Sequence, residues 1–160
     1  LDSALMGAFL ALSAVFHVIV ASPGVFERYP RLKAAVTEGS SIWVPELLHL
    51  MDHRYGEHHF TAKLGTGYRK HLKMKPSEYF HRNFLCTFIR DAIGIQLRHD
   101  IGVRNMAWST DFPHHGNDWP YSRRVVNEMF EGVPAPERYE ICAGNMVRLY
   151  GLPQSRERSA

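Results

Sequence analysis

The segment "NMAWSTDFPHHGNDWP", residues 105–120, joins a short apolar run to a carboxylate, two histidines and a turn rich in Gly, Asn and Pro. A short apolar run bounded by turn-forming residues is typical of a buried β-strand. We therefore expect a strand over "NMAWSTDF", residues 105–112, with Asp111 at its carboxyl end. The Pro-His-His-Gly turn then leads the chain away from the strand.

Two earlier segments have the same form. "LKAAVTEG", residues 32–39, is an apolar run whose carboxyl end holds Glu38, and "FLCTFI", residues 84–89, is followed by Arg90 and Asp91. Each is predicted to be a buried strand with polar side chains at its carboxyl end.

Helical patterns alternate with these strands. A short helical turn is expected before Pro30, and residues 55–75 form a polar excursion in which we expect a loop with a helical piece, serving as an interface or lid. The expected longer helices lie within residues 4–21, 41–55, 75–84, 91–102, 121–132 and 135–152. Strands that alternate with helices indicate an α/β fold with parallel strands joined by right-handed crossovers.

In parallel α/β folds, the carboxyl ends of the strands and the loops that follow them carry the chemistry. Here those ends hold Glu38, Arg90 with Asp91, and Asp111 with His114 and His115. Because all three strands offer polar residues at the same edge, we expect a functional site there.

The motif around Asp111 has two interpretations. A carboxylate beside imidazoles can bind a hard or borderline divalent metal, which lowers the pKa of bound water toward neutrality. Asp111 could then bind the metal, take a proton from its water, or do both. Alternatively, Asp111 caps the following turn and the histidines lie on the surface, which is the commoner use of Asp in such a motif.

Composition limits the class of protein. The chain has 160 residues, about one domain, and a formal net charge of +3. Its Lys and Arg residues are mostly scattered, whereas nucleic-acid binders usually show a basic stripe with a recognisable motif, so we expect no nucleic-acid partner.

The cysteines and the first apolar segment bear on location. Cys86 and Cys142 are far apart in the sequence, lie among apolar neighbours and form no metal-binding motif, so we expect two reduced, buried thiols in a cytoplasmic protein, with a single disulfide as the alternative. Residues 4–21 are long enough for a membrane span or export signal, but no basic segment precedes them. We favour a buried helix and no membrane association.

Four segments together resemble a known family. They are "GVFERYPRLKAAVTEGSSIWVPELLHLMD" (24–52), "KPSEYFHRNFLCTF" (75–88), "NMAWSTDFPHHGNDWPYSR" (105–123) and "GNMVRLYGL" (144–152). In this order they resemble the C-terminal half of the amidohydrolase-2 family. These are metal-dependent TIM-barrel proteins similar to aminocarboxymuconate-semialdehyde decarboxylase and the hydroxybenzoate-type decarboxylases, with hydrolases among them.

The resemblance implies an α/β fold, a (β/α)8 TIM barrel of which this chain supplies strands six to eight and their flanking helices. Residues 1–152 would be the C-terminal part of a single barrel, and residues 153–160 a polar tail. Asp111 would be the strand-eight aspartate that binds the metal and carries protons. Decarboxylating members have a histidine at the end of strand six, where this chain has Glu38.

The family's remaining metal ligands, a His-x-His motif and a further histidine, would lie upstream of Leu1. A whole barrel needs about 250 residues. We therefore expect the N-terminal half of the barrel either in a longer chain or supplied as a separate partner, and we expect this half to be inactive alone. A homodimer is also expected, because members of this family often dimerise.

The implied function is that of a metal-dependent hydrolase acting on a small carboxylic acid, amide, ester or lactone, or of a nonoxidative decarboxylase. The cofactor would be a divalent metal, zinc or alternatively manganese. Glu38 would face the substrate or support a metal ligand from behind, Arg90 would bind a substrate carboxylate, and His114 would orient the metal ligand. The alternative is a non-catalytic barrel or a fragment that acts as an assembly module.

Overall fold

The protein is described from a computed structural model that covers residues 24–57 and 72–153. Strands β1 (Ala34–Val36), β2 (Phe84–Phe88) and β3 (Met106–Trp108) form one parallel sheet in the order β1-β2-β3. Because consecutive strands are neighbours and parallel, each connection is a crossover that returns the chain to the same edge of the sheet. The expected α/β architecture with parallel strands is therefore confirmed.

The central position of β2 explains why its sequence is continuously apolar. Every residue of β2 is buried, since β2 pairs with strands on both sides, whereas Ala35 in the outer strand β1 is exposed. The pairing aligns Ala34 with Phe84 and Cys86 with Met106, so the three carboxyl ends reach the same edge.

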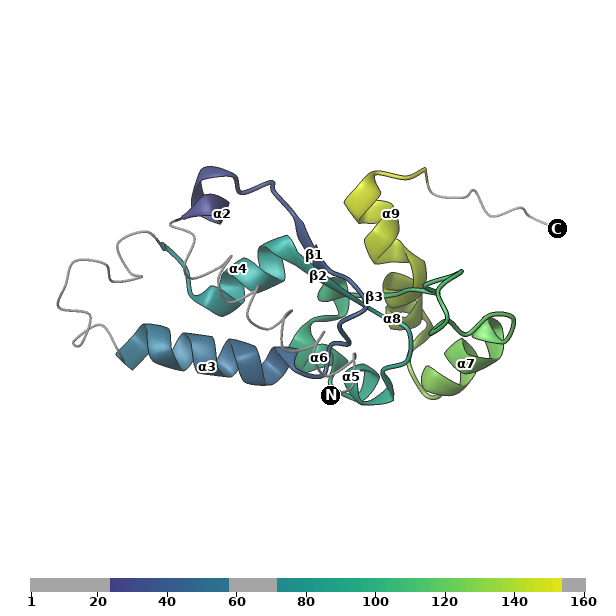
Figure 1. Ribbon diagram of the computed structural model, residues 1–160. Helices are drawn as coiled ribbons and strands as arrows, with labels where there is room; N and C mark the ends of the chain where they lie inside the picture. The colour runs from purple at the N-terminus through teal and green to yellow at the C-terminus, as the bar shows by residue number, and fades with distance from the viewer. Residues whose placement is uncertain (1–23, 58–71, 154–160) are drawn as a thin grey trace.

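Helical segments connect and flank the strands (Figure 1). They are α2 (Val25–Arg28), α3 (Val44–Glu57), α4 (Pro76–Asn83), α5 (Ala92–Gln96), α6 (Arg98–Ile101), the 3-10 turn η3 (Val103–Asn105), α7 (Ser122–Met129), α8 (Ala135–Tyr139), the π-helical turn η4 (Glu140–Gly144) and α9 (Asn145–Tyr150).

Most of the helices follow the expected pattern, with two refinements. The helix expected within residues 91–102 forms as α5 and α6, because Leu97 between them leaves the helical region at φ −87° and ψ 11°. The last expected helix is one helical run that contains the π-helical turn η4 between α8 and α9. The crossover from β1 to β2 holds both α3 and α4, as expected.

The predictions for two segments fall partly or wholly outside the described residues. The helix expected over residues 4–21 lies outside them, as does most of the polar excursion of residues 55–75. Its first residues belong to the end of α3. In the described ranges, no helix is long and apolar enough to cross a membrane.

One part of the core lies where α3 and α4 pack together, antiparallel and side by side, next to the sheet (Figure 1), and the same buried cluster continues to β3, α7 and η4. Aromatic rings fill the space between α2, α4 and β2. Phe84 stacks on Phe80 at a centroid distance of 5.5 Å and meets Phe26 edge-on at 5.3 Å. All three rings are buried, so this cluster joins the short helix α2 to the sheet.

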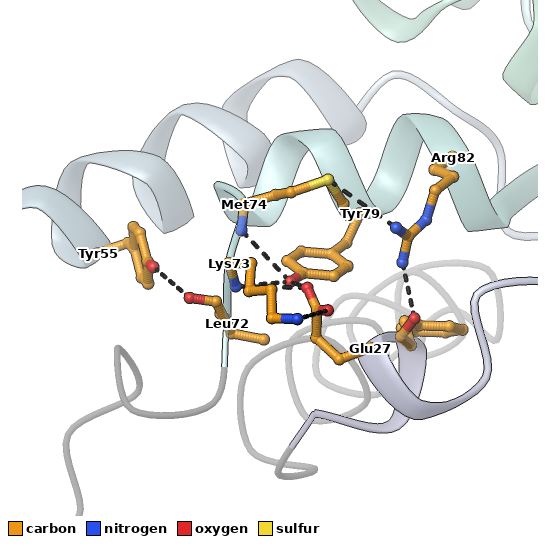
Figure 2. Close-up of polar contacts among 8 residues, drawn as sticks. Glu27, Tyr55, Leu72, Lys73, Met74, Tyr79 and Arg82 are labelled. Atoms are coloured by element: carbon orange, nitrogen blue, oxygen red, sulfur yellow. Dashed lines mark hydrogen bonds and ion pairs between the residues drawn. The ribbon is translucent and has the colours of Figure 1, made fainter.

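A polar cluster on the same side of the core anchors α2 to α4 (Figure 2). The buried Tyr79 hydroxyl donates to Glu27, and it accepts hydrogen bonds from the backbone N–H groups of Lys73 at 2.9 Å and Met74 at 3.3 Å. The guanidinium of Arg82 lies over the Tyr79 ring and donates to the Phe26 carbonyl at 2.7 Å. These contacts satisfy the polar groups that surround the aromatic core.

Both cysteines are free thiols, and the expected burial holds for Cys86 but only in part for Cys142. Cys86 is buried in β2, and Cys142 in η4 is half-buried.

Candidate active site

The residues predicted to form the site do come from the carboxyl ends of the strands. Glu38 follows β1, Arg90 follows β2, and Asp111 and His114 follow β3. The structure places Asp111 against His114 and brings Glu38 beside Asp111. Arg90 is at the same edge but is engaged elsewhere.

Asp111 is the centre of this group. Its Oδ2 lies 2.9 Å from Nδ1 of His114, and its side chain is only 13% exposed, whereas that of His114 is 56% exposed. The carboxylate is thus shielded while the imidazole faces solvent. A hydrogen bond of 2.8 Å from the His114 backbone N–H to the Asp111 carbonyl closes the turn that holds the pair together.

Glu38, in the loop after β1, reaches across the end of β2 to Asp111, in the loop after β3. The hydrogen bond with Asp111 raises the pKa of the Glu38 carboxyl, partial desolvation and the charge of Asp111 raise it further, and His114 lowers it. The backbone N–H of Glu38 donates to Oγ1 of Thr87 at 3.0 Å, which fixes the loop after β1 to β2. The close approach of Asp111 therefore favours the protonated form of Glu38.

Backbone strain is concentrated at this edge. Within the part of the chain that the structure describes, the non-glycine residues with positive φ are Glu38 (59°), Ser40 (56°) and Asp111 (53°). The left-handed region is sparsely used by residues with a Cβ atom and costs on the order of 1–3 kcal/mol each. The surrounding structure therefore holds two loops in conformations that aim Glu38 and Asp111 at each other.

Asp91 supplies much of that restraint. This buried carboxylate accepts hydrogen bonds from the Ser40 hydroxyl at 2.7 Å, from the Ser41 backbone N–H at 2.6 Å and from the Ser41 hydroxyl at 2.7 Å. It also caps α5 by accepting from the Gly94 N–H at 2.8 Å. A Cβ atom at Gly94 would lie 2.3 Å from Asp91 Oδ2, so only glycine fits beside this carboxylate.

Arg90 forms an ion pair with Asp118. Both its Nε and its Nη2 contact Oδ1 of Asp118, whose side chain is almost fully buried. This pair fastens the turn after β3 to the end of β2. Oδ2 of Asp118 is buried and has no hydrogen-bond partner. The role of Arg90 as a substrate-binding residue stays a prediction.

A metal ion can be tested against the donors present. Among residues 24–57 and 72–153, no three His, Cys, Asp or Glu side chains form a group that could hold a metal by themselves. Asp111 suits one ligand position, because its carboxylate is shielded and already oriented by His114. The described residues by themselves therefore do not form a complete metal site, and Asp111 is the donor among them that would suit one ligand position.

Sequence reasoning identified the contacting group but missed its supports. Asp91 was visible as a polar residue at a strand end, yet its serine partners lie about 50 positions earlier and nothing local indicates the contact. Asp118 sits in a turn segment, where an acid is usually a solvent-exposed turn former. Only its near-complete burial distinguishes it.

The comparisons with known proteins agree with this architecture. The model of the amidohydrolase-2 family, whose description is amidohydrolase, matches residues 12–152. The chain belongs to the amidohydrolase-2 family. No curated protein sequence matches it.

Solved structures show the same fold. The 5-carboxyvanillate decarboxylase of Sphingomonas paucimobilis is 25% identical with a TM-score of 0.67, and the match covers 88% of this chain and 39% of that chain. A dihydroxybenzoic acid decarboxylase of a Polaromonas species, solved with manganese and the inhibitor 2-nitroresorcinol, is 22% identical with a TM-score of 0.63, covering 96% and 42%. An amidohydrolase of Mycobacterium avium subsp. paratuberculosis is 22% identical with a TM-score of 0.66, covering 84% and 32%.

The chain thus spans about one third to two fifths of the length of these structures. Its three parallel strands and their helices are part of a (β/α)8 barrel, as predicted. In such barrels the carboxyl ends of the strands form the active-site face, which is where Glu38, Asp111 and His114 meet.

Proposed function

We propose that the whole protein is a metal-dependent enzyme of the amidohydrolase-2 type that removes carbon dioxide, without oxidation, from a small carboxylic acid. The observation that carries the proposal is the contact of Glu38 with Asp111, held by two strained loops at the active-site edge. Nonoxidative decarboxylation needs a proton delivered to the carbon that loses its carboxyl group, and two hydrogen-bonded carboxyl groups keep a proton available there.

Asp111 would be one metal ligand, with His114 fixing its orientation through the 2.9 Å contact. When bound, the metal would act as a Lewis acid that polarises substrate oxygens. Glu38 takes the place of the histidine found in decarboxylating relatives, and its carboxyl group can hold and donate the proton. The family membership and the decarboxylases among the similar structures support this assignment. Zinc and manganese both suit a mixed carboxylate and imidazole site, and manganese is the ion in one similar structure.

A second candidate function rests on Arg90. Its guanidinium is paired with the buried Asp118, so it is less available to bind a substrate carboxylate. This favours hydrolysis of a small amide, ester or lactone, in which Asp111 would take a proton from the attacking water.

The experiment combines elemental analysis with two assays on the longest native chain that contains this sequence, called the full chain below, after reconstitution with manganese or zinc. Carbon dioxide release from a panel of hydroxybenzoic acids tests decarboxylation, and acid release from lactones and esters tests hydrolysis. We expect about one divalent metal per chain and release of carbon dioxide. Asp111→Ala should lose most of the metal, and Glu38→Gln should keep the metal but lose at least 100-fold in turnover, because general acids contribute about that much.

Matched controls are Asp100→Ala and Glu131→Gln, which remove exposed acids far from the strand ends and should change neither metal content nor turnover. Acid release without carbon dioxide would favour the hydrolase. A full chain that takes up no metal and acts on neither panel would favour a non-catalytic assembly module.

A further inference from the structure

A cavity of about 400 Å³ lies at the amino-terminal ends of the strands, the edge opposite to Glu38 and Asp111. Its walls come from the segment before β1, the junction of α4 with β2, the segment before β3, and α9. Its basic lining residues are Arg31, Lys33, His81, Arg82, Arg104 and Arg148. No Asp or Glu is among the described residues that line it.

Three asparagines form the frame of this cavity. Asn83, Asn105 and Asn145 line it and are only 1–4% exposed. The side-chain NH2 group of each donates to two or three backbone carbonyls near the strand starts, over 2.7–3.3 Å. These bonds satisfy carbonyls that would otherwise be unpaired, so the frame is rigid.

The same asparagines also position basic side chains. Oδ1 of Asn83 accepts from Nε of Arg82 at 2.9 Å, and Oδ1 of Asn145 accepts from Nη2 of Arg148. Each asparagine therefore turns one face to the backbone and one to a cation. His81 is placed in the same way, with its Nδ1 3.2 Å from Oδ1 of Asn105.

The remaining cations are less engaged. Arg31 and Arg104 are exposed and make no hydrogen bond or ion pair with the residues that the structure describes. Lys33 donates to the backbone carbonyl of Arg82, which brings no negative charge. Among the residues that the structure describes, Arg148 is the cavity cation with an ion-pair partner, Glu140 at 2.6 Å.

The cavity thus gathers five of the 19 Lys and Arg residues around one space, in a chain whose net charge is only +3, and the described part of the chain offers them one ion-pair partner, Glu140. Like charges held together repel, and an anion between them removes that repulsion. Guanidinium groups suit phosphate oxygens, to which they can donate two parallel hydrogen bonds. A volume of this size is in the range of small-molecule sites.

We propose that this cavity binds a small ligand with two or more phosphate groups, at the barrel face opposite to the active site. Arg148, held by Asn145, forms the prearranged part, Arg82 adds positive charge from the wall while its nitrogens donate to Asn83, Met74 and the Phe26 carbonyl, and the exposed Arg31 and Arg104 bind the ligand from the outside. The site is independent of the proposed decarboxylation, since it uses other residues at the other edge of the sheet.

Calorimetric titration of pyrophosphate into the full chain at constant ionic strength tests the proposal. We expect saturable binding of one pyrophosphate per chain, weakened at least tenfold in the double variant Arg31→Ala with Arg104→Ala. The matched control is Arg123→Ala with Arg124→Ala, which removes the same charge from α7, outside the cavity. It should bind within twofold of the unmodified protein.

Three further arms decide the source of binding. Asp111→Ala should keep pyrophosphate affinity, and loss there would place the anion on the active-site metal and overturn the proposal. Equal affinity for citrate, or equal weakening in both double variants, would overturn it as a phosphate site. Binding of long polyanions such as heparin without pyrophosphate would also overturn it. Circular dichroism of each variant confirms that the fold is kept.

Discussion

Ser41 donates two hydrogen bonds to the buried carboxylate of Asp91, from its backbone N–H at 2.6 Å and from its hydroxyl at 2.7 Å. The two residues belong to different loops, one after β1 and one after β2. Their contact locks the loop that carries Glu38 to the end of the neighbouring strand. The geometry of the candidate active site therefore depends on Asp91, whose carboxylate binds the serines of the Glu38 loop.

Replacing Asp91 should loosen this edge. Asp91→Ala leaves Ser41 and the Gly94 N–H without their acceptor in a buried setting, and we expect a loss of about 2–4 kcal/mol in the free energy of unfolding. Urea unfolding of the full chain measures it. Asp100→Ala, which removes an exposed acid, should cost less than about 0.5 kcal/mol. Equal stability of the Asp91 variant would mean that the four hydrogen bonds do not restrain the loops.

The buried asparagines should be as important to the amino-terminal edge. The Asn105 amide donates to the carbonyls of Phe80, His81 and Phe84 at 2.8–3.3 Å. Asn105→Ala removes these donors, and we expect a loss of about 2–4 kcal/mol in the free energy of unfolding. Asn127→Ala on the exposed face of α7 is the control and should change stability by about 0.5 kcal/mol or less. A similar small effect in both variants would contradict a structural role for Asn105.

The sequence predicted the parallel sheet and the edge at which polar residues gather. Each apolar run that ends in Glu38, Arg90 or Asp111 is a local pattern, and it indicates both a buried strand and the polar residue at its carboxyl end. It also predicted that Asp111 and His114 lie together, since three positions separate them. It could not predict that Arg90 pairs with Asp118, or that Asp91 binds Ser41. Those contacts join residues 28 and 50 positions apart, and they are set by how the loops pack rather than by any spacing.

The hydrogen bond from Tyr79 to Glu27 should make stability depend on pH. This bond lowers the pKa of Glu27 in the folded protein, with further lowering from the Lys73 N–H and ammonium. A folded pKa below the unfolded value of about 4.3 adds stability that is present above that pH and is lost as pH falls through the folded pKa. The contribution of Glu27 should therefore be complete at neutral pH and absent in strong acid.

We expect Glu27→Gln to be less stable than the unmodified chain at pH 7 by about 1 kcal/mol, typical of one hydrogen bond to a charged group near the surface. The difference should shrink below about pH 4. Unfolding in urea at several pH values measures it. Glu131→Gln removes an exposed acid with no such partner and should show no comparable trend. A constant difference from pH 7 to pH 3 would contradict a stabilising hydrogen bond from Tyr79 to the ionised Glu27 carboxylate.

The two free cysteines should differ in reactivity. Burial raises the pKa of the Cys86 thiol to about 12, and the charge of Asp91 adds to the effect, so very little thiolate exists at pH 8. Burial also raises the pKa of the Cys142 thiol, but Arg138 opposes the rise and the side chain is only half-buried. Because the thiolate is the reactive form, Cys142 should be modified first.

A thiol-specific disulfide reagent at pH 8 should therefore label the native full chain at Cys142, and Cys86 only after unfolding by urea. Cys142→Ser should leave neither of these two positions labelled in the folded chain. Cys86→Ser should leave the labelling rate of Cys142 unchanged. Mass spectrometry of the labelled peptides assigns each position. Labelling of Cys86 in the folded chain at a rate like that of Cys142 would show that β2 opens readily, against its complete burial between β1 and β3.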